Sequence, residues 1–277
     1  MTLLEAVVLG IVQGLTEFLP ISSTAHLRVI PALLGWADPG AAFSAVIQIG
    51  TVVAVLFYFR RDLWEIGTAF LRGLRDRRPF ADPHARMGWF IGAGTVPIVV
   101  FGLLFERQIK SELRSLWVIA AALIGVGVLM AVADRLAEKR RRRAGDDAVT
   151  LADALVVGVA QACALVPGVS RSGSTLAAGL FRGLSRAEAA RFSFLLSVPA
   201  VTAAGLKELY ELLGTGLAGV GAANLIAGTV VSFVVGYLAI AGLLAFLRTR
   251  TVTVFVVYRV VIGLGLVALV GAGILQA

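Results

Sequence analysis

Two short polar stretches interrupt otherwise apolar sequence, and together they hold a carboxylate, an imidazole and a guanidinium. The first, residues 13–26, reads QGLTEFLPISSTAH and includes Glu17 and His26. The second, residues 167–175, reads PGVSRSGST and includes Arg171. Ionisable groups are costly inside a membrane and usually mark a functional site there. We therefore expect the two stretches to form one site.

Each stretch has the composition of a break between two helices. Pro20 and the pair Pro167–Gly168 cannot continue an incoming helix, and hydroxyl residues that suit helix N-caps follow them. The expected caps are Ser22, Ser23 and Thr24 in the first stretch and Ser172, Ser174 or Thr175 in the second. Both breaks would then direct a helix N-terminus, with unpaired N–H groups, at a shared anion, most naturally a phosphate.

The charged residues of the stretches suit chemistry on that anion. Arg171 supplies a forked cation that matches phosphate oxygens, and Gly173 lets the backbone approach closely. Gln13 and Glu17 are four residues apart and share a helix face. Glu17 could bind a divalent metal, act as a base or orient His26. An acid, an imidazole, hydroxyls and an arginine around one phosphate predict phosphoryl transfer.

Plainer interpretations of the same residues remain open. Glu17 could be a structural acid paired with an arginine, His26 an interhelical hydrogen-bonding residue, and the hydroxyls helix caps alone. An anion transporter would use Arg171 and the helix ends without chemistry. Transport of an anion, however, has no need of Glu17 together with His26.

The composition places the chain in a membrane. Of its 277 residues, 58% are hydrophobic and only 15% charged, whereas soluble domains are nearer 45–50% apolar. The net charge of +8 sits in short loops between apolar segments, which is the positive-inside pattern rather than a nucleic-acid surface. A single cysteine, Cys163, excludes an internal disulfide. The first residues lack a basic n-region, so we expect no cleaved signal peptide.

Apolar segments long enough to cross a membrane alternate with two interrupted ones. Residues 3–34 and 149–182 each break into runs too short to span, so each predicts a re-entrant helical hairpin. The expected spans are residues 41–59, 87–105, 116–133, 192–213, 225–247 and 252–275. Residues 60–86 read as a basic loop. Arg259, inside the last span, is expected to snorkel to the cytoplasmic interface.

Short matches recur in the same order along the two halves of the chain. Gly10–Gln13 matches Gly158–Gln161, Pro20 matches Pro167, Ser22 matches Ser170, Phe43–Ser44 matches Phe192–Ser193, Gly94–Val96 matches Gly228–Val230, and Ile124–Gly127 matches Ile262–Gly265. The fold class predicted is an all-α polytopic membrane protein, one domain over residues 1–277, with repeats at 1–143 and 146–277. Each repeat holds one re-entrant hairpin and three transmembrane helices, and an odd number of spans inverts the second repeat relative to the first.

Charge then predicts the orientation. If residues 60–86, residues 134–148 and the pair Arg248 and Arg250 are cytoplasmic, every strongly basic loop lies on one side. Both termini are then outside. The first hairpin enters from outside and the second from the cytoplasm, so their tips would meet near the midplane.

Residues 13–26 and 167–175 resemble the two signature motifs of the undecaprenyl-diphosphate phosphatases linked to bacitracin resistance, and the resemblance covers essentially the whole chain. Gln13 stands where that family has Glu or Gln, which leaves Glu17 as the sole acid of the motif. Ala25 stands where the family usually has Gly. That substitution suggests a tip that needs no positive φ at this position.

The resemblance implies hydrolysis of undecaprenyl diphosphate to the monophosphate and phosphate, which recycles the lipid carrier for peptidoglycan synthesis. It implies a multi-pass protein of the bacterial cytoplasmic (inner) membrane with its site open to the outer side. It also implies a divalent cation, Mg or Ca, for which Glu17 is the candidate ligand. The expected partners are a polyprenyl diphosphate and membrane lipids, with no nucleic acid, and a homodimer is left open. The runner-up function is a transporter or flippase of a phosphate-bearing lipid.

Motif matching assigns the chemistry to Glu17, His26 and Arg171 and places Ser22, Ser23, Ser170 and Thr175 around the phosphates. The expected geometry of the tips adds a hypothesis for Ser23 as a fourth catalytic candidate, which either attacks the β-phosphate or positions a water. The candidates for substrate binding are Gln13, Ser22, Thr24, Ser170, Ser172, Gly173 and Thr175.

Overall fold

A computed structural model describes the chain apart from residues 38–39, 106–107, 109–114, 141–148, 216–220 and 276–277. Its described elements are α-helices. In chain order they are α1 (Leu3–Phe18), α2 (Ser23–Leu34), α3 (Gly40–Tyr58), α4 (Arg60–Arg75), α5 (Pro83–Leu104), α7 (Leu116–Arg140), α8 (Leu151–Cys163), α9 (Arg171–Phe181), α10 (Arg186–Thr215), α11 (Ala222–Leu247) and α12 (Thr253–Gly271).

The helices confirm a multi-pass membrane protein. Five of them, α5, α7, α10, α11 and α12, contain segments long and apolar enough to cross a bilayer. The helices α3 and α4 meet at a bend of 70° and add a sixth span if they are counted together. A helix needs about 20 apolar residues to cross the hydrocarbon core, which these segments supply.

The prediction of a loop over residues 60–86 was wrong. Helix α4 occupies most of this range, and α5 begins inside it at Pro83, with Asp82 as its N-cap. Ile66 and Ala69 of α4 are buried, and its arginines lie on other faces. The prediction of a loop rested on the charge of the segment. The helical spacing of its apolar residues was the pattern that indicates a helix.

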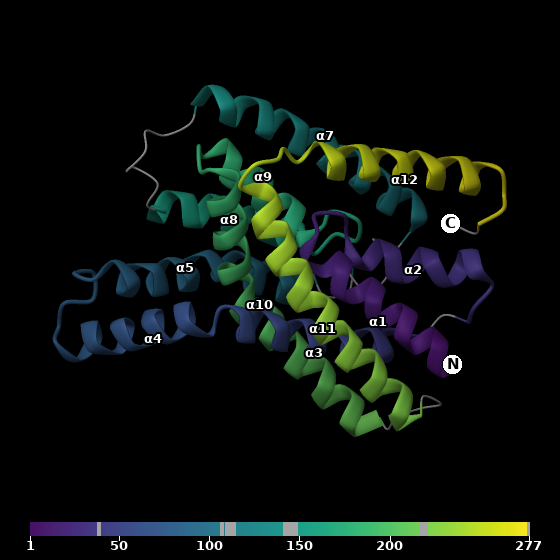
Figure 1. Cartoon of the computed structure of the whole chain (residues 1–277), viewed down its shortest axis with the longest axis horizontal. Coiled ribbons are helices and arrows are strands. Elements are labelled where there is room, and N and C mark those ends of the chain that lie inside the picture. Colours follow the sequence, from purple (N-terminus) through teal and green to yellow (C-terminus); the bar gives the residue numbers. More distant parts are fainter. Residues whose placement is uncertain (38–39, 106–107, 109–114, 141–148, 216–220, 276–277) are drawn as a thin grey trace.

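Both predicted breaks are present. Helices α1 and α2 have 16 and 12 residues, and α8 and α9 have 13 and 11, so none of the four spans a bilayer alone. Capping boxes start α1 at Thr2 and α8 at Thr150, with Glu5 and Asp153 as their acidic partners. The connections α1–α2 and α8–α9 lie close together near the centre of the molecule (Figure 1), where Gly168 N–H donates to Thr24 Oγ1 at 3.4 Å.

Each hairpin packs against a helix from the other half of the chain. Helix α1 lies on α11, and a Cβ atom added to Gly10 would come within 2.5 Å of the carbonyl oxygen of Gly228. Helix α8 lies on α5, and a Cβ atom added to Gly158 would come within 2.3 Å of the carbonyl oxygen of Gly94. Small residues let membrane helices approach this closely. These four glycines are the positions that match between the two halves of the sequence.

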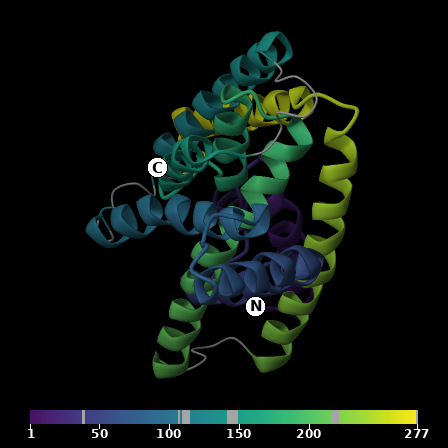
Figure 2. The ribbon, with the colours of Figure 1, turned by 90° about the vertical axis from the view of Figure 1, so that its left-hand side faces the viewer.

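The ends of the chain lie on one side of the molecule. The start of α1 and the end of α12 are at the right in Figure 1, and the α4–α5 turn and the end of α7 are at the left. Viewed from that left side in Figure 2, α10 passes the centre to the bottom and α11 runs along the right-hand side, while α4 and α5 lie in front of α1 and α2. The two breaks therefore lie between two opposite ends of the protein.

We expect Gly10→Ala to destabilise the protein by more than about 1 kcal/mol, because backbone of α11 fills the space that the new methyl group needs. The check is the thermal unfolding midpoint of the purified protein in detergent. Gly92→Ala in α5 is the matched control, since nothing lies within 4 Å of its added Cβ. Equal midpoints for the two variants would contradict the close packing of α1 on α11.

Candidate active site

Two serines with positive φ shape the breaks. Ser22 and Ser170 have φ of 77° and 67°, and each directly precedes an outgoing helix, α2 or α9. Such a conformation costs a non-glycine residue about 1–3 kcal/mol and clusters at functional sites. The two breaks therefore share one backbone conformation before the outgoing helix. Ser23 and Arg171 are the first residues of these two helices.

The expected caps were only partly correct. Ser22 occupies the N-cap position of α2 without a side-chain capping bond. In the second break the cap is Ser170, whose Oγ accepts from Gly173 N–H at 3.2 Å, and not Ser172, Ser174 or Thr175. The reason is that α9 starts at Arg171, which places those three hydroxyls inside the helix.

Glu17 joins the two breaks. Its Oε1 accepts from Arg171 Nη2 at 2.9 Å, and its Oε2 accepts from Ser23 Oγ at 2.9 Å and Gln13 Nε2 at 3.1 Å. Glu17 is therefore bonded to the first residue of both outgoing helices. The predicted meeting of the tips, with the carboxylate of one facing the guanidinium of the other, is observed.

Arg171 retains a free donor in this arrangement. Its side chain is 12% exposed, and Nη1 is buried with no hydrogen-bond partner among the described residues. A buried unpaired donor on a cation is costly unless a ligand satisfies it. An anion held between the two helix N-termini would supply the missing acceptor.

His26 is held by groups other than Glu17. Its Nδ1 lies 2.7 Å from the Ser22 carbonyl oxygen, and its Nε2 lies 2.6 Å from the Tyr258 hydroxyl. Because a carbonyl only accepts, Nδ1 carries a proton, and Nε2 of the neutral ring accepts from Tyr258. The two rings stack at 5.6 Å between centroids. His26 thus fixes the strained Ser22. The expectation that Glu17 orients His26 is not met, because both ring nitrogens have other partners.

The remaining hydroxyls tie the breaks together. Ser172 Oγ donates to the Leu19 carbonyl at 3.1 Å, which joins α9 to the first hairpin. Thr175 donates to the Arg171 carbonyl at 2.6 Å and bonds to Ser193 of α10. Thr24 is exposed at the start of α2 and Ser23 is half-buried. Ser23 and Thr24 are therefore more accessible than Ser172 and Thr175, which are buried.

Tyr258 was not predicted as a site residue, and the prediction for Arg259 was wrong. Arg259 does not snorkel: it is 0% exposed, and its guanidinium donates to carbonyl oxygens at both breaks. Gly173, expected beside the anion, packs on this group, since its added Cβ would lie 3.4 Å from Arg259 Nη1. The sequence did contain a signal for Arg259, because an arginine within an apolar span usually marks a functional region. The same argument had been used for Arg171.

The polar site offers few protein ligands to a metal. The described residues contain no group of three or more His, Cys, Asp or Glu that could hold a metal ion. Within the described part of the chain, Glu17 is the one carboxylate bonded at the breaks, and its oxygens accept three hydrogen bonds. Mg²⁺ is commonly held by one or two carboxylates plus substrate phosphates. The described residues therefore do not form a closed protein cage for a metal, and Glu17 is the carboxylate they offer at the breaks.

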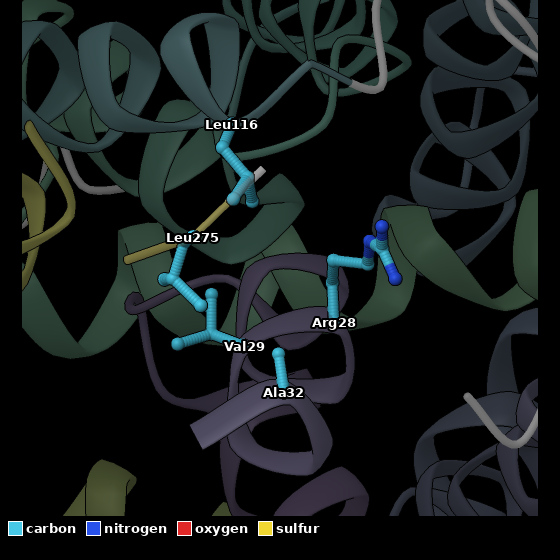
Figure 3. A pocket seen from close by; sticks show the side chains of 5 residues that line it. All are labelled: Arg28, Val29, Ala32, Leu116 and Leu275. Carbon is cyan, nitrogen blue, oxygen red and sulfur yellow. The ribbon is translucent and has the colours of Figure 1, made fainter. Parts of the chain in front are cut away.

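A separate cavity of about 160 Å³ lies along the later turns of α2. It is lined by Arg28, Val29, Ala32, Leu116 and Leu275, from α2, the start of α7 and the end of the chain (Figure 3). Its lining is apolar apart from Arg28, and it shares no residue with the polar site.

Comparison with known proteins identifies the family. The family model for bacitracin resistance protein BacA matches residues 6–265. The chain is 52% identical to the undecaprenyl-diphosphatase of Prosthecochloris aestuarii, with 100% of both chains covered. It is 54% identical to that of Chlorobium phaeovibrioides and 49% identical to that of Chlorobaculum tepidum, each with 99% of both chains covered. With full-length relatives at this identity and both signature stretches joined through Glu17, the chain belongs to the BacA bacitracin resistance family.

Proposed function

We propose that this protein hydrolyses undecaprenyl diphosphate to undecaprenyl phosphate and inorganic phosphate. Relatives about half identical over the full length carry the name undecaprenyl-diphosphatase. The observation that carries the proposal is the bridge of Glu17 to Ser23 and Arg171, which sets a base, a hydroxyl and a phosphate-binding cation at one point.

The contacts suggest how the reaction proceeds. Arg171 Nη1 and the N–H groups at the starts of α2 and α9 receive the diphosphate oxygens and stabilise charge on the transferred phosphoryl group. An oxygen nucleophile forms a bond to the β-phosphorus, and the bond from that phosphorus to the bridging oxygen breaks, which releases undecaprenyl phosphate. Glu17 Oε2, already bonded to the Ser23 hydroxyl, accepts the proton of the nucleophile. If the nucleophile is Ser23, water then hydrolyses the phosphoserine.

The alternative of a transporter or flippase for a phosphate-bearing lipid is not favoured. Arg171 and the helix N-termini would serve transport equally well. Glu17 bonded to the hydroxyl of Ser23 is the feature that binding alone does not require. The names of the relatives also favour hydrolysis.

We further propose that a divalent cation, Mg or Ca, would bind together with the substrate. Glu17 is its candidate protein ligand, with diphosphate oxygens as the others. The ion would neutralise charge on the transferred phosphoryl group. Oε1 of Glu17 accepts one hydrogen bond, from Arg171, whereas Oε2 accepts two, so the second lone pair of Oε1 is the one open to an ion.

We also propose two inverted repeats in the bacterial inner membrane, with the site open to the outer side. The reciprocal packing of Gly10 on Gly228 and of Gly158 on Gly94 supports a pseudo-two-fold relation of the halves. The start of α1 and the end of α12 lie opposite the α4–α5 turn and the end of α7 (Figure 1), which supports the separation of termini and basic loops. A homodimer stays a prediction.

The central prediction is phosphate release. Detergent-purified protein with a polyprenyl diphosphate and Mg²⁺ should release inorganic phosphate, and Glu17→Gln should lower kcat by at least about 100-fold, because the proton acceptor is lost. Chelation with EDTA should abolish release, and added Mg²⁺ or Ca²⁺ should restore it. Glu138→Gln, an exposed acid of α7, is the matched control. Well-folded protein that releases no phosphate with either ion would refute the proposal and favour transport.

The same assay separates the roles of Ser23. If Ser23 is the nucleophile, Ser23→Ala should be inactive, and acid quenching of the native protein should trap phosphoserine. If Ser23 positions a water, the variant should retain partial activity with no trapped intermediate. Full activity of Ser23→Ala would exclude both roles.

Tyr258→Phe should lower kcat/KM by about fivefold, since it removes one hydrogen bond worth about 1 kcal/mol from His26. The measurement is steady-state phosphate release. Tyr210→Phe is the control, because that side chain is 79% exposed and should have no effect. Equal rates for both variants would show that Tyr258 does not act through His26.

The orientation is tested by labelling single cysteines in intact cells. In a Cys163→Ala background, Arg250→Cys, between α11 and α12, should resist a membrane-impermeant maleimide until the cells are opened. Thr2→Cys, at the start of α1, should react at once. The reverse pattern would place the active site on the cytoplasmic side.

A further inference from the structure

Arg259 has an unusual environment for a buried cation. It lies in α12, is fully buried, and its guanidinium donates only to backbone carbonyls in the contacts described. Nη1 donates to Pro20 at 3.2 Å, and Nη2 donates to Gly168 at 2.9 Å and Val169 at 3.1 Å. Nε donates to Leu123 at 3.1 Å and Nη2 also to Ala122 at 3.1 Å, both in α7. One side chain therefore contacts the first break, the second break and the helix α7.

Three of the five acceptors of Arg259, the carbonyls of Pro20, Gly168 and Val169, are groups that the breaks leave without a helical partner. A helix end has carbonyls without an intrahelical partner, and at membrane depth each unsatisfied group costs several kcal/mol. Pro20, Gly168 and Val169 lie within the breaks, outside any helix. A guanidinium, with five donors in a fixed fork, satisfies several such carbonyls at once. Their dipoles in turn offset the cost of burying its charge.

These carbonyls lie directly before the residues that do the chemistry. Pro20 is two residues before Ser22, and Val169 directly precedes Ser170, so Arg259 fixes the backbone that enters each positive-φ serine. Ser23 and Arg171 follow those serines, and both bond to Glu17. Any shift of one break against the other would separate these groups.

We propose that Arg259 is a positioning residue, which locks the two broken hairpins in register so that Ser23, Glu17 and Arg171 meet the diphosphate together. The inference rests on the proposed phosphatase function for its kinetic consequence. Lysine would keep the charge but offers a compact ammonium in place of the planar fork. It would reach fewer of the five carbonyls and leave the breaks free to shift.

The kinetic test uses the full-length protein purified in detergent, with Arg259→Lys and Arg259→Gln compared on the monodisperse fraction. We expect kcat to fall by about 100-fold in both variants, because a misplacement of about 1 Å in a reacting group has this effect, with a smaller change in KM. Arg248→Gln, an exposed arginine at the end of α11, is the control. A purely structural role predicts less folded protein with a normal kcat per folded molecule, and that result would overturn the proposal.

A second measurement does not depend on activity. Spin labels on the native Cys163, at the end of α8, and on Leu33→Cys, in α2, report the distance between the two hairpins. We expect one narrow distance distribution in the parent protein and a broad one with Arg259→Lys. The pair Leu71→Cys and Leu103→Cys, in α4 and α5 with Cys163→Ala, should stay unchanged.

The two measurements separate the two proposals. Absence of phosphate release from the parent protein would refute the function but leave the distance test intact. An unchanged width between the hairpins in Arg259→Lys would refute the positioning role, whatever the activity of the parent protein.

Discussion

The structure depends on one carboxylate that two helix breaks share. Glu17 takes a hydrogen bond from Ser23 and an ion pair from Arg171, which are the first residues of the two outgoing helices. Removal of one partner from a buried ion pair costs about 3–5 kcal/mol, because a charge is left unpaired. This interaction therefore holds the hairpins together in the free protein, and it also holds the groups that a phosphate would need.

That arrangement carries strain that the surroundings must offset. Ser22 and Ser170 have positive φ, and the carbonyls of Pro20, Gly168 and Val169 lie outside any helix. His26 bonds to the Ser22 carbonyl, and Arg259 bonds to carbonyls of both breaks. Helix α12 supports both of these contacts. Tyr258 of α12 bonds to His26, and Arg259 is the next residue of the same helix. The last helix thus stabilises a site formed by residues far earlier in the chain.

Much of the fold could be predicted because the bilayer limits what each segment can do. Runs of apolar residues too short to span, with proline between them, predicted the breaks at residues 19–22 and 164–170. The helix α4 was missed because its apolar residues are few and its charges dominate. The inverted relation of the halves was inferred from sequence matches and remains a proposal. The meeting of Glu17 and Arg171 was predicted from the expectation that the two tips face each other.

The sequence by itself determined the class of protein, the two breaks and the chemical groups of the site, because hydropathy and helix-breaking residues act locally. Only the tertiary structure decided which partner each group has. His26 bonds to Tyr258 and not to Glu17, Ser170 rather than a later hydroxyl caps α9, and Arg259 is buried rather than at the interface. The physical reason is that unpaired carbonyls and donors at a break can be satisfied by any element that packs beside it. Which element packs there depends on how α12 lies across the breaks, and no local pattern encodes that contact.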